Sequence, residues 1–140
     1  MTRREFQQTV REAWRKIPPR FRRQVHNLAI VVEPEPSRGL LRRSGVPPQD
    51  TLLGLYQGVP LAQRSSGYGM VLPDKISLFQ GPIERAARQQ EDIPQIVFET
   101  LWHELAHYFG MSEREVRTME RQHRRPRRPP PGDSRSPGPG

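Results

Sequence analysis

Apolar residues recur at the three- and four-residue spacing of a helix near the N-terminus. They are Phe6, Val10, Trp14 and Ile17. Thr2 suits the N-cap of such a helix, and Pro18 and Pro19 end it. Its arginines then form the outer face. The pattern predicts an amphipathic helix that packs on a core, and a helix lying on a membrane surface is the alternative interpretation.

A second helical stretch begins near Asp92, which suits the N-cap, and ends at Gly110. Pro94 fits its first turn. Its apolar positions are Ile93, Val97, Leu101, Leu105 and Tyr108. The helical spacing of these residues directs one stripe of the helix towards a core.

Short apolar runs between the two helices predict strands. Residues 28–32 form a candidate for a buried strand, and residues 75–79 alternate as a half-buried strand does. Residues 52–56 and 59–62 suggest a hairpin around Gln57-Gly58. The expected fold class is α+β, with a small mixed sheet on which the N-terminal helix and the second helix pack.

The remaining segments predict loops and a tail. Residues 34–50 and 64–74 are rich in Pro, Gly and Ser, so we expect loops there. Residues 121–140 hold six Pro, three Gly and almost nothing apolar, and such a segment cannot bury enough surface to fold. We therefore expect a single domain over residues 1–120 and a disordered Pro- and Arg-rich tail over residues 121–140.

Length and composition limit the class of protein. A chain of 140 residues with 33% apolar residues and 16 Pro has room for one domain with a modest core. The absence of cysteine excludes a disulfide framework and a thiolate metal site. The longest apolar run is residues 28–32, so we expect neither a signal peptide nor a membrane span. The expected location is the cytoplasm.

The net charge of +8 is concentrated at the two ends of the chain. Residues 1–23 carry eight basic and two acidic groups, and residues 121–140 carry six and one. Residues 24–120 carry nine basic and twelve acidic groups, so the expected core is mildly acidic. The tail is either a solvated segment or a weak contact for nucleic acid or another anionic partner, because clustered arginine neutralises phosphates.

The strongest chemical signal is the sequence HELAH at residues 103–107. His103 and His107 lie one turn apart on one face of the second helix, near enough to share a metal ion. Glu104 lies on the flank of that face, where it can reach a metal-bound water without becoming a ligand. Residues of these types at this spacing indicate a zinc hydrolase.

An open zinc site needs a third ligand from outside that helix. Gly110 can adopt the left-handed conformation that ends a helix and reverses the chain. Ser112 suits the N-cap of a following helix, with Glu115 as its capping-box partner, which turns Glu113 back towards the histidines. Glu113 is therefore the favoured third ligand. The rivals are Glu115, Glu120 and His123.

The motif resembles that of the zincins, and in particular the Asp-zincin pattern H-E-x-x-H-x-x-G-x-x-D. The short chain resembles the mini-zincins, a family of small bacterial zincin-like metallopeptidases. Residues 72–84, LPDKISLFQGPIE, resemble the strand and turn that precede the active-site helix in that family. The resemblance implies a minimal zincin-like metalloprotease fold and a Zn²⁺ ion held by His103, His107 and Glu113, with Glu104 as the base. The family usually has Asp where this chain has Glu113. Glutamate keeps the negative charge and is one methylene longer.

The resemblance implies a zinc-dependent peptidase that acts on a peptide or protein substrate, which pairs with an edge strand of the sheet. Tyr68 and Tyr108 are candidates to stabilise the developing oxyanion. One alternative is a non-catalytic metal-binding module whose basic termini hold nucleic acid or another anionic partner. Another is a structural zinc site, in which protein groups fill the fourth position.

Overall fold

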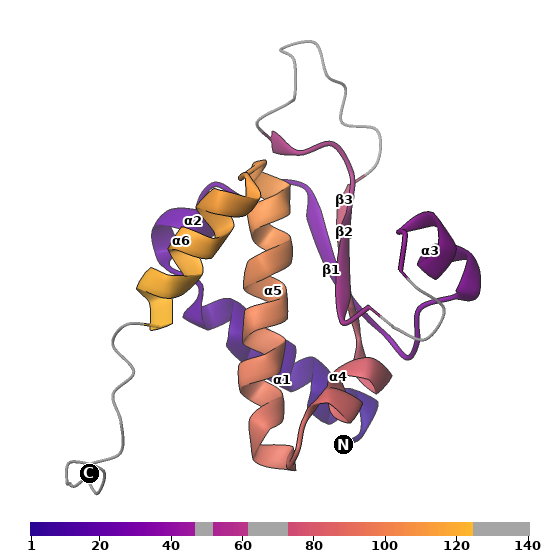
Figure 1. The fold of residues 1–140 in the computed structure, drawn as a ribbon. Coiled ribbons are helices and arrows are strands. Elements are labelled where there is room, and N and C mark those ends of the chain that lie inside the picture. Colours follow the sequence, from indigo (N-terminus) through magenta and orange to yellow (C-terminus); the bar gives the residue numbers. More distant parts are fainter. Residues whose placement is uncertain (47–51, 62–72, 125–140) are drawn as a thin grey trace, which may run out of the picture. The chain divides into compact units, whose positions relative to one another are not determined.

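The structure is a computed structural model that describes residues 1–46, 52–61 and 73–124 (Figure 1). The side chains of residues 113, 119, 120 and 122–124 lie outside this description. The chain separates into two compact units, Met1–Gly110 and Met111–Gly140. The domain boundary at residue 120 and the disorder of the tail stay predictions, since residues 125–140 lie outside the described part.

The N-terminal helix is confirmed as α1, Arg3–Lys16. The Thr2 hydroxyl accepts from the Glu5 amide at 3.0 Å, and the Glu5 carboxylate accepts from the Thr2 amide at 2.8 Å. This reciprocal pair satisfies two amides that a helix start leaves without partners. Phe6, Val10 and Ala13 are buried on one face. A one-turn helix that the sequence did not predict, α2 (Pro19–Arg22), follows.

The sheet is small and mixed, as expected. It comprises β1 (Leu28–Glu33), β2 (Gly54–Gln57) and β3 (Asp74–Phe79). Within the described residues the strand order is β1-β3-β2, with β1 parallel and β2 antiparallel to β3. The central strand is therefore the last of the three described strands along the sequence.

The strand order corrects three sequence expectations. β1 is half-exposed along its whole length rather than buried, because it lies at an edge of the sheet. β3 is almost fully buried rather than half-buried, because strands flank it on both sides. The predicted hairpin is wrong: residues 59–61 form no strand, and β2 pairs with β3 instead. Pro60 has no backbone N–H that could donate to a neighbouring strand. Residue 62, the last residue of the predicted hairpin, lies outside the described part of the chain.

One expected loop contains a helix. Residues 38–43 form α3, and the Ser37 hydroxyl caps it by accepting from the Leu40 amide at 3.0 Å. The expectation of an uninterrupted loop over residues 34–50 was wrong because Ser37 offers an N-cap. Most of the loop expected at residues 64–74 lies outside the described part, and its last residue, Asp74, begins β3.

The second helix is confirmed as α5, Ile93–Phe109, which follows α4 (Gln80–Ala86) and the 3₁₀ turn η2 (Gln90–Asp92). Asp92 stands at the N-cap position, but its carboxylate accepts from the Gln89 amide and does not cap α5. All five residues of the expected stripe are buried. Phe98, Trp102 and Ala106 are buried too, so α5 is covered on more than one face.

The core of the first unit lies between the sheet and two helices. α1 and α5 pack against each other and against the sheet, as Figure 1 shows. The apolar side chains that fill this layer include Phe6, Ile17, Ile76, Leu78, Leu101 and Leu105. No helix in the described part of the chain is both long and apolar enough to span a membrane.

The second unit begins with α6, Glu113–Arg124. The Ser112 hydroxyl accepts from the Glu115 amide at 3.1 Å, and the Glu115 carboxylate accepts from the Ser112 amide at 2.7 Å. The expected capping box is thus confirmed.

Candidate metal centre and active site

α5 brings His103, Glu104 and His107 together. One ligand atom from each residue lies within 4.8 Å of the other two, and the two imidazole centroids are 4.7 Å apart. Both histidines are half-buried, whereas Glu104 is only 8% exposed. Imidazole nitrogen and carboxylate oxygen are donors that zinc takes in proteins, so this cluster fits a zinc ion.

The Glu104 carboxylate is held by the sheet. Its Oε1 accepts from the backbone amide of Tyr56, in β2, at 2.9 Å. The same oxygen lies 3.4 Å from Nδ1 of His107, which is long for a hydrogen bond. A bond from a backbone amide to a carboxylate is charge-assisted and fixes the direction of the acceptor. Strand β2 therefore sets the orientation of the acidic group beside the histidines.

Gly54 allows β2 to lie close to α5. A Cβ at this position would stand 2.7 Å from Cγ2 of Thr100 and 3.0 Å from the Ser77 carbonyl oxygen. Two residues of a strand advance about 7 Å, and four residues of a helix advance about 6 Å. Tyr56 follows Gly54 by two residues in β2, and Glu104 follows Thr100 by four residues in α5. The similar advance along both elements therefore places the Tyr56 amide beside Glu104, as Gly54 lies beside Thr100.

The side chain of Tyr56 anchors the same strand. Its hydroxyl donates to Oδ2 of Asp74 at 2.8 Å, and Asp74 is only 3% exposed. The Tyr56 ring meets the Tyr108 ring edge to face, with centroids 5.9 Å apart. Sequence reasoning missed both Tyr56 and Asp74. Tyr56 reaches the site through its backbone, which no side-chain motif reveals, whereas a glycine such as Gly54 inside an apolar run is a recognised sign of close backbone approach.

Tyr108 does not serve as an oxyanion group in this arrangement. Its side chain is fully buried, and its hydroxyl accepts from the His26 amide and donates to the His26 carbonyl oxygen, both at 3.1 Å. It joins the end of α5 to the chain just before β1. The other candidate, Tyr68, lies outside the described residues.

α5 ends just after the cluster, at the glycine that the sequence predicted. Gly110 ends α5 in the left-handed conformation, with φ 80° and ψ 26°. Glu113 is the first residue of α6, but its side chain lies outside the description, so its role as third ligand stays a prediction. Glu115 is engaged in the cap of α6. The side chains of Glu120 and His123 lie outside the description.

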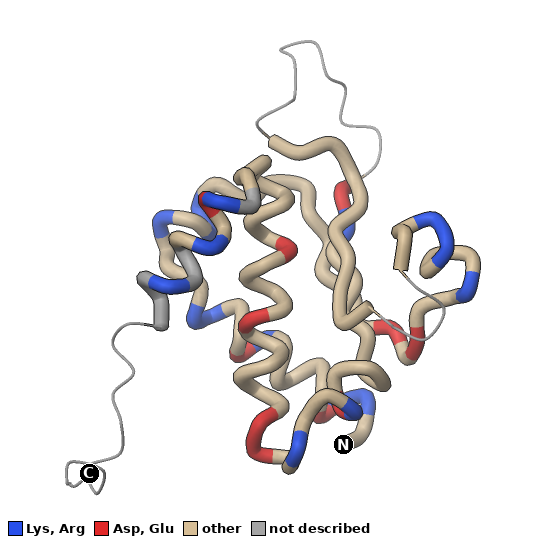
Figure 2. The backbone as a smooth tube through the Cα atoms, viewed as in Figure 1, with Lys and Arg blue, Asp and Glu red and all other residues tan. Residues whose placement is uncertain are grey.

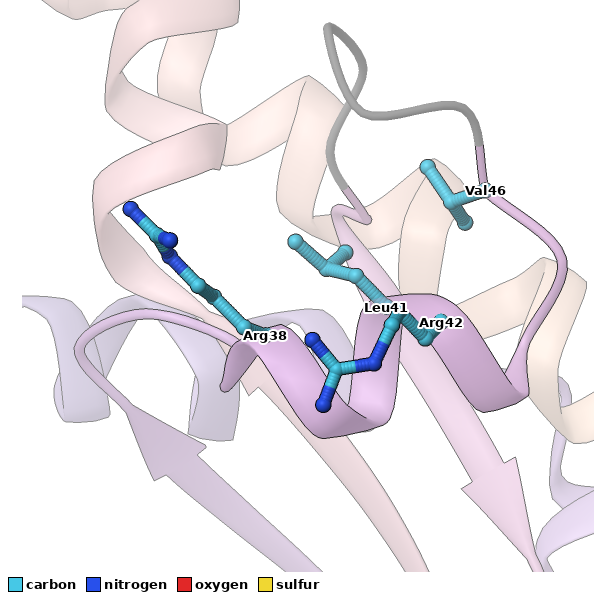
Figure 3. A pocket seen from close by; sticks show the side chains of 4 residues that line it. All are labelled: Arg38, Leu41, Arg42 and Val46. Atoms are coloured by element: carbon cyan, nitrogen blue, oxygen red, sulfur yellow. The ribbon is translucent and has the colours of Figure 1, made fainter.

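Charge distinguishes α5 from the two N-terminal helices. The only charged residues of α5 besides its histidines are acidic, whereas Lys and Arg lie along α1 and α2 (Figure 2). A hollow of about 440 Å³ lies at α3, where Arg38 and Leu41 extend from the helix and Arg42 and Val46 complete the lining (Figure 3). No residue of α5 or β2 lines that hollow, so it is separate from the cluster of His103, Glu104 and His107. The cluster is identified as the candidate site by its metal-binding groups.

Comparison with known proteins identifies the family. A search of the curated proteins found no significant match. Among solved structures, the chain is similar to a conserved hypothetical protein from Thermus thermophilus, with 29% identity and a TM-score of 0.54. That match covers 78% of this chain and 94% of the other. The family model of the zincin-like metallopeptidases matches residues 25–123, which include all three strands of the sheet and α5. The chain belongs to the zincin-like metallopeptidase family.

Proposed function

We propose that this protein is a zinc-dependent peptidase. The observation that carries the proposal is the cluster of His103, Glu104 and His107, in which the backbone of β2 holds the carboxylate. The two histidines and Glu113 would hold the ion, because a catalytic zinc takes three protein ligands and keeps one position open. Membership of a metallopeptidase family supports peptide hydrolysis as the reaction.

Each group of the chain then has a distinct task. Zinc bound at this site would supply Lewis-acid activation of a water and of the scissile carbonyl. Glu104 accepts the proton of the attacking water and passes it to the leaving amine. The Tyr56 amide orients Glu104 for this transfer by donating to its carboxylate.

The outer edge of β2 is the proposed place of the substrate. The Phe79 amide donates to the Leu53 carbonyl oxygen, so the alternation of an antiparallel ladder turns the amides of Gly54 and Tyr56 away from β3. The Tyr56 amide indeed points to Glu104. Because Glu104 takes the Tyr56 amide, a peptide extended along this edge would meet the carboxylate and the histidines at that point and could bond to the strand only beside it.

The first test measures the metal. Protein purified without added metal should contain nearly one zinc per chain, and His103→Ala or His107→Ala should remove it. Glu113→Gln should also lower the zinc content, whereas Glu115→Gln in the same turn should leave it unchanged. Unchanged zinc in Glu113→Gln would show that another group is the third ligand.

The second test separates the base from a ligand. Glu104→Gln should lower the rate of cleavage of an unfolded polypeptide by about a hundredfold to ten-thousandfold, the usual contribution of a general base, while zinc stays bound. Glu91→Gln, an exposed carboxylate in η2, serves as the matched control. Cleavage that persists in Glu104→Gln would refute the peptidase mechanism, and loss of zinc would make Glu104 a ligand.

A further inference from the structure

The outer edge of β1 offers backbone groups to a partner. The Asp74 amide donates to the Asn27 carbonyl oxygen at 3.0 Å, and Leu28 stands opposite Asp74. In a parallel ladder, alternate residues of a strand bond to the same neighbour. Leu28, Ile30 and Val32 therefore direct their amides and carbonyls away from β3. Among the described residues, no strand pairs with that side of β1.

Among the described residues, this edge has few of the features that usually protect an exposed strand, and Glu33 is the one charged residue of β1. β1 reads LAIVVE, and all six residues are half-exposed. In natural proteins a lysine, a proline, a bulge or a very short length commonly prevents an edge strand from pairing with another chain. β1 has six residues, contains neither lysine nor proline, and pairs with β3 in unbroken register. Its aliphatic composition favours the addition of another strand.

An apolar groove runs beside this edge, between β1 and α1. It has a volume of about 380 Å³. Its apolar lining comprises Val10, Trp14, Val25, Leu28 and Ile30. Arg11 and Arg15, on α1, complete the lining. The side chains of a strand added to β1 would alternate between this groove and the opposite face.

The arginines of the groove indicate the charge of the occupant. The Arg11 guanidinium donates to Oε1 of Gln8, and among the described residues neither Arg11 nor Arg15 pairs with a carboxylate. Residues 1–23 carry eight basic and two acidic groups, and Figure 2 shows this charge along α1 and α2. An acidic segment complements this surface, whereas a second copy of the chain paired through β1 would bring its own basic α1 towards the same edge. The basic residues 121–140 would be repelled as well.

We propose that the outer edge of β1 and the groove beside it bind an extended acidic segment of a partner protein. The segment adds to the sheet as a strand, bonds to the backbone of β1, places aliphatic side chains in the groove and pairs its carboxylates with Arg11 and Arg15. Only a polypeptide satisfies both the backbone groups of the strand and the apolar groove. The proposal is independent of the peptidase function, because β2 lies at the opposite edge.

A labelled peptide tests the proposal. The probe is a fluorescein-labelled octapeptide, Glu-Thr-Val-Thr-Val-Thr-Glu-Thr, whose one face carries two valines between two glutamates. It is titrated with the full chain and followed by fluorescence anisotropy. We expect saturable binding that becomes at least about tenfold weaker when Lys replaces both Glu, or in the protein variant Arg11→Glu/Arg15→Glu. The matched variant Arg3→Glu/Arg4→Glu reverses as many charges on α1 outside the groove and should bind as the parent does.

Backbone readouts locate the bound peptide. Amide hydrogen exchange should slow at Ile30 and Val32 when the probe binds, and a probe with N-methylated valines should bind at least about tenfold more weakly because it cannot complete the ladder. Slowed exchange at Gly54, whose amide also points away from β3, without slowing at Ile30 and Val32 would put the peptide on β2 and overturn the proposal.

Four other results would also overturn the proposal. Two concern the probe: binding that does not saturate up to about 1 mM probe, or an N-methylated probe that binds as tightly as the parent probe. Two concern the protein: a loss of binding in Arg3→Glu/Arg4→Glu as large as that in Arg11→Glu/Arg15→Glu, or self-association of the chain that Arg11→Glu/Arg15→Glu abolishes. Preferred binding of an oligonucleotide or of phosphatidylglycerol vesicles through Arg11 and Arg15 would assign the surface to nucleic acid or membrane instead.

Discussion

The approach of β2 to α5 leads to a sharp prediction for Gly54→Ala. The added methyl group would stand 2.7 Å from Cγ2 of Thr100, whereas carbon atoms pack at about 3.5–4.0 Å. Thr100 is buried in a helix and cannot swing aside, since its hydroxyl donates to the Ile96 carbonyl oxygen at 2.8 Å. Strand β2 must therefore shift by about 1 Å, and this shift would lengthen the bond from Tyr56 to Glu104.

The magnitude follows from two opposing effects. Overpacking of a filled interior costs about 1–3 kcal/mol. Replacing glycine by alanine recovers about 0.4–1 kcal/mol because the unfolded chain becomes less flexible. The expected net loss is about 1–2 kcal/mol of unfolding free energy, or a fall in melting temperature of about 3–7 °C for a chain of this size.

A double-mutant cycle identifies the cause. Thr100→Ser removes Cγ2 and keeps the hydroxyl, so Gly54→Ala should cost about 1 kcal/mol less in the Thr100→Ser background than in the parent. Urea denaturation of the four proteins gives the coupling energy. Peptidase activity should fall in the single variant Gly54→Ala while the zinc content stays constant. A neutral Gly54→Ala, or an equal cost in both backgrounds, would refute the close packing of β2 on α5.

Three further predictions follow from contacts in the first unit. Tyr108→Phe should lower the unfolding free energy by about 1–3 kcal/mol, because the two hydrogen bonds between the buried Tyr108 hydroxyl and the His26 backbone are lost; an unchanged urea midpoint would contradict this. Gly110→Ala should cost about 1–2 kcal/mol in thermal unfolding, since φ is 80° there, and Gly110→Asn should cost less. Arg85 holds the pKa of the Glu35 carboxyl below its usual value through a hydrogen bond. The pair therefore stabilises the fold above the usual carboxyl pKa and stops doing so as the pH falls through the lowered one. Glu35→Gln should thus cost a small amount of stability at pH 7 and nothing in strong acid, as denaturation at both pH values would show.

Local signals allowed α1, α5 and the start of α6 to be predicted from the sequence. Thr2 with Glu5 and Ser112 with Glu115 form the capping boxes that their spacing indicates, and Gly110 ends α5 in the left-handed conformation. Each of these features depends on residues within a few positions of one another, so short-range pattern is sufficient to find them.

Pairing between distant segments could not be read in the same way. Residues 52–62 suggested a local hairpin, but β2 pairs with β3, which begins at Asp74. The exposure of β1 depends on its place at the edge, and strand order is a long-range property that the alternation of side chains does not encode. For the same reason the sequence identified Glu104 but not Tyr56, whose contact joins residues 48 positions apart.

Asp74 connects the two edges of the sheet. Its amide donates to Asn27, just before β1, and its carboxylate accepts from the Tyr56 hydroxyl in β2. The strand that orients Glu104 and the strand proposed to bind an acidic segment are thus held by one buried residue of the central strand. The helices make the two edges chemically different, because β2 faces the acidic group of α5 whereas β1 faces the arginines of α1. The two edges of this three-stranded sheet therefore offer different chemical surroundings to a polypeptide.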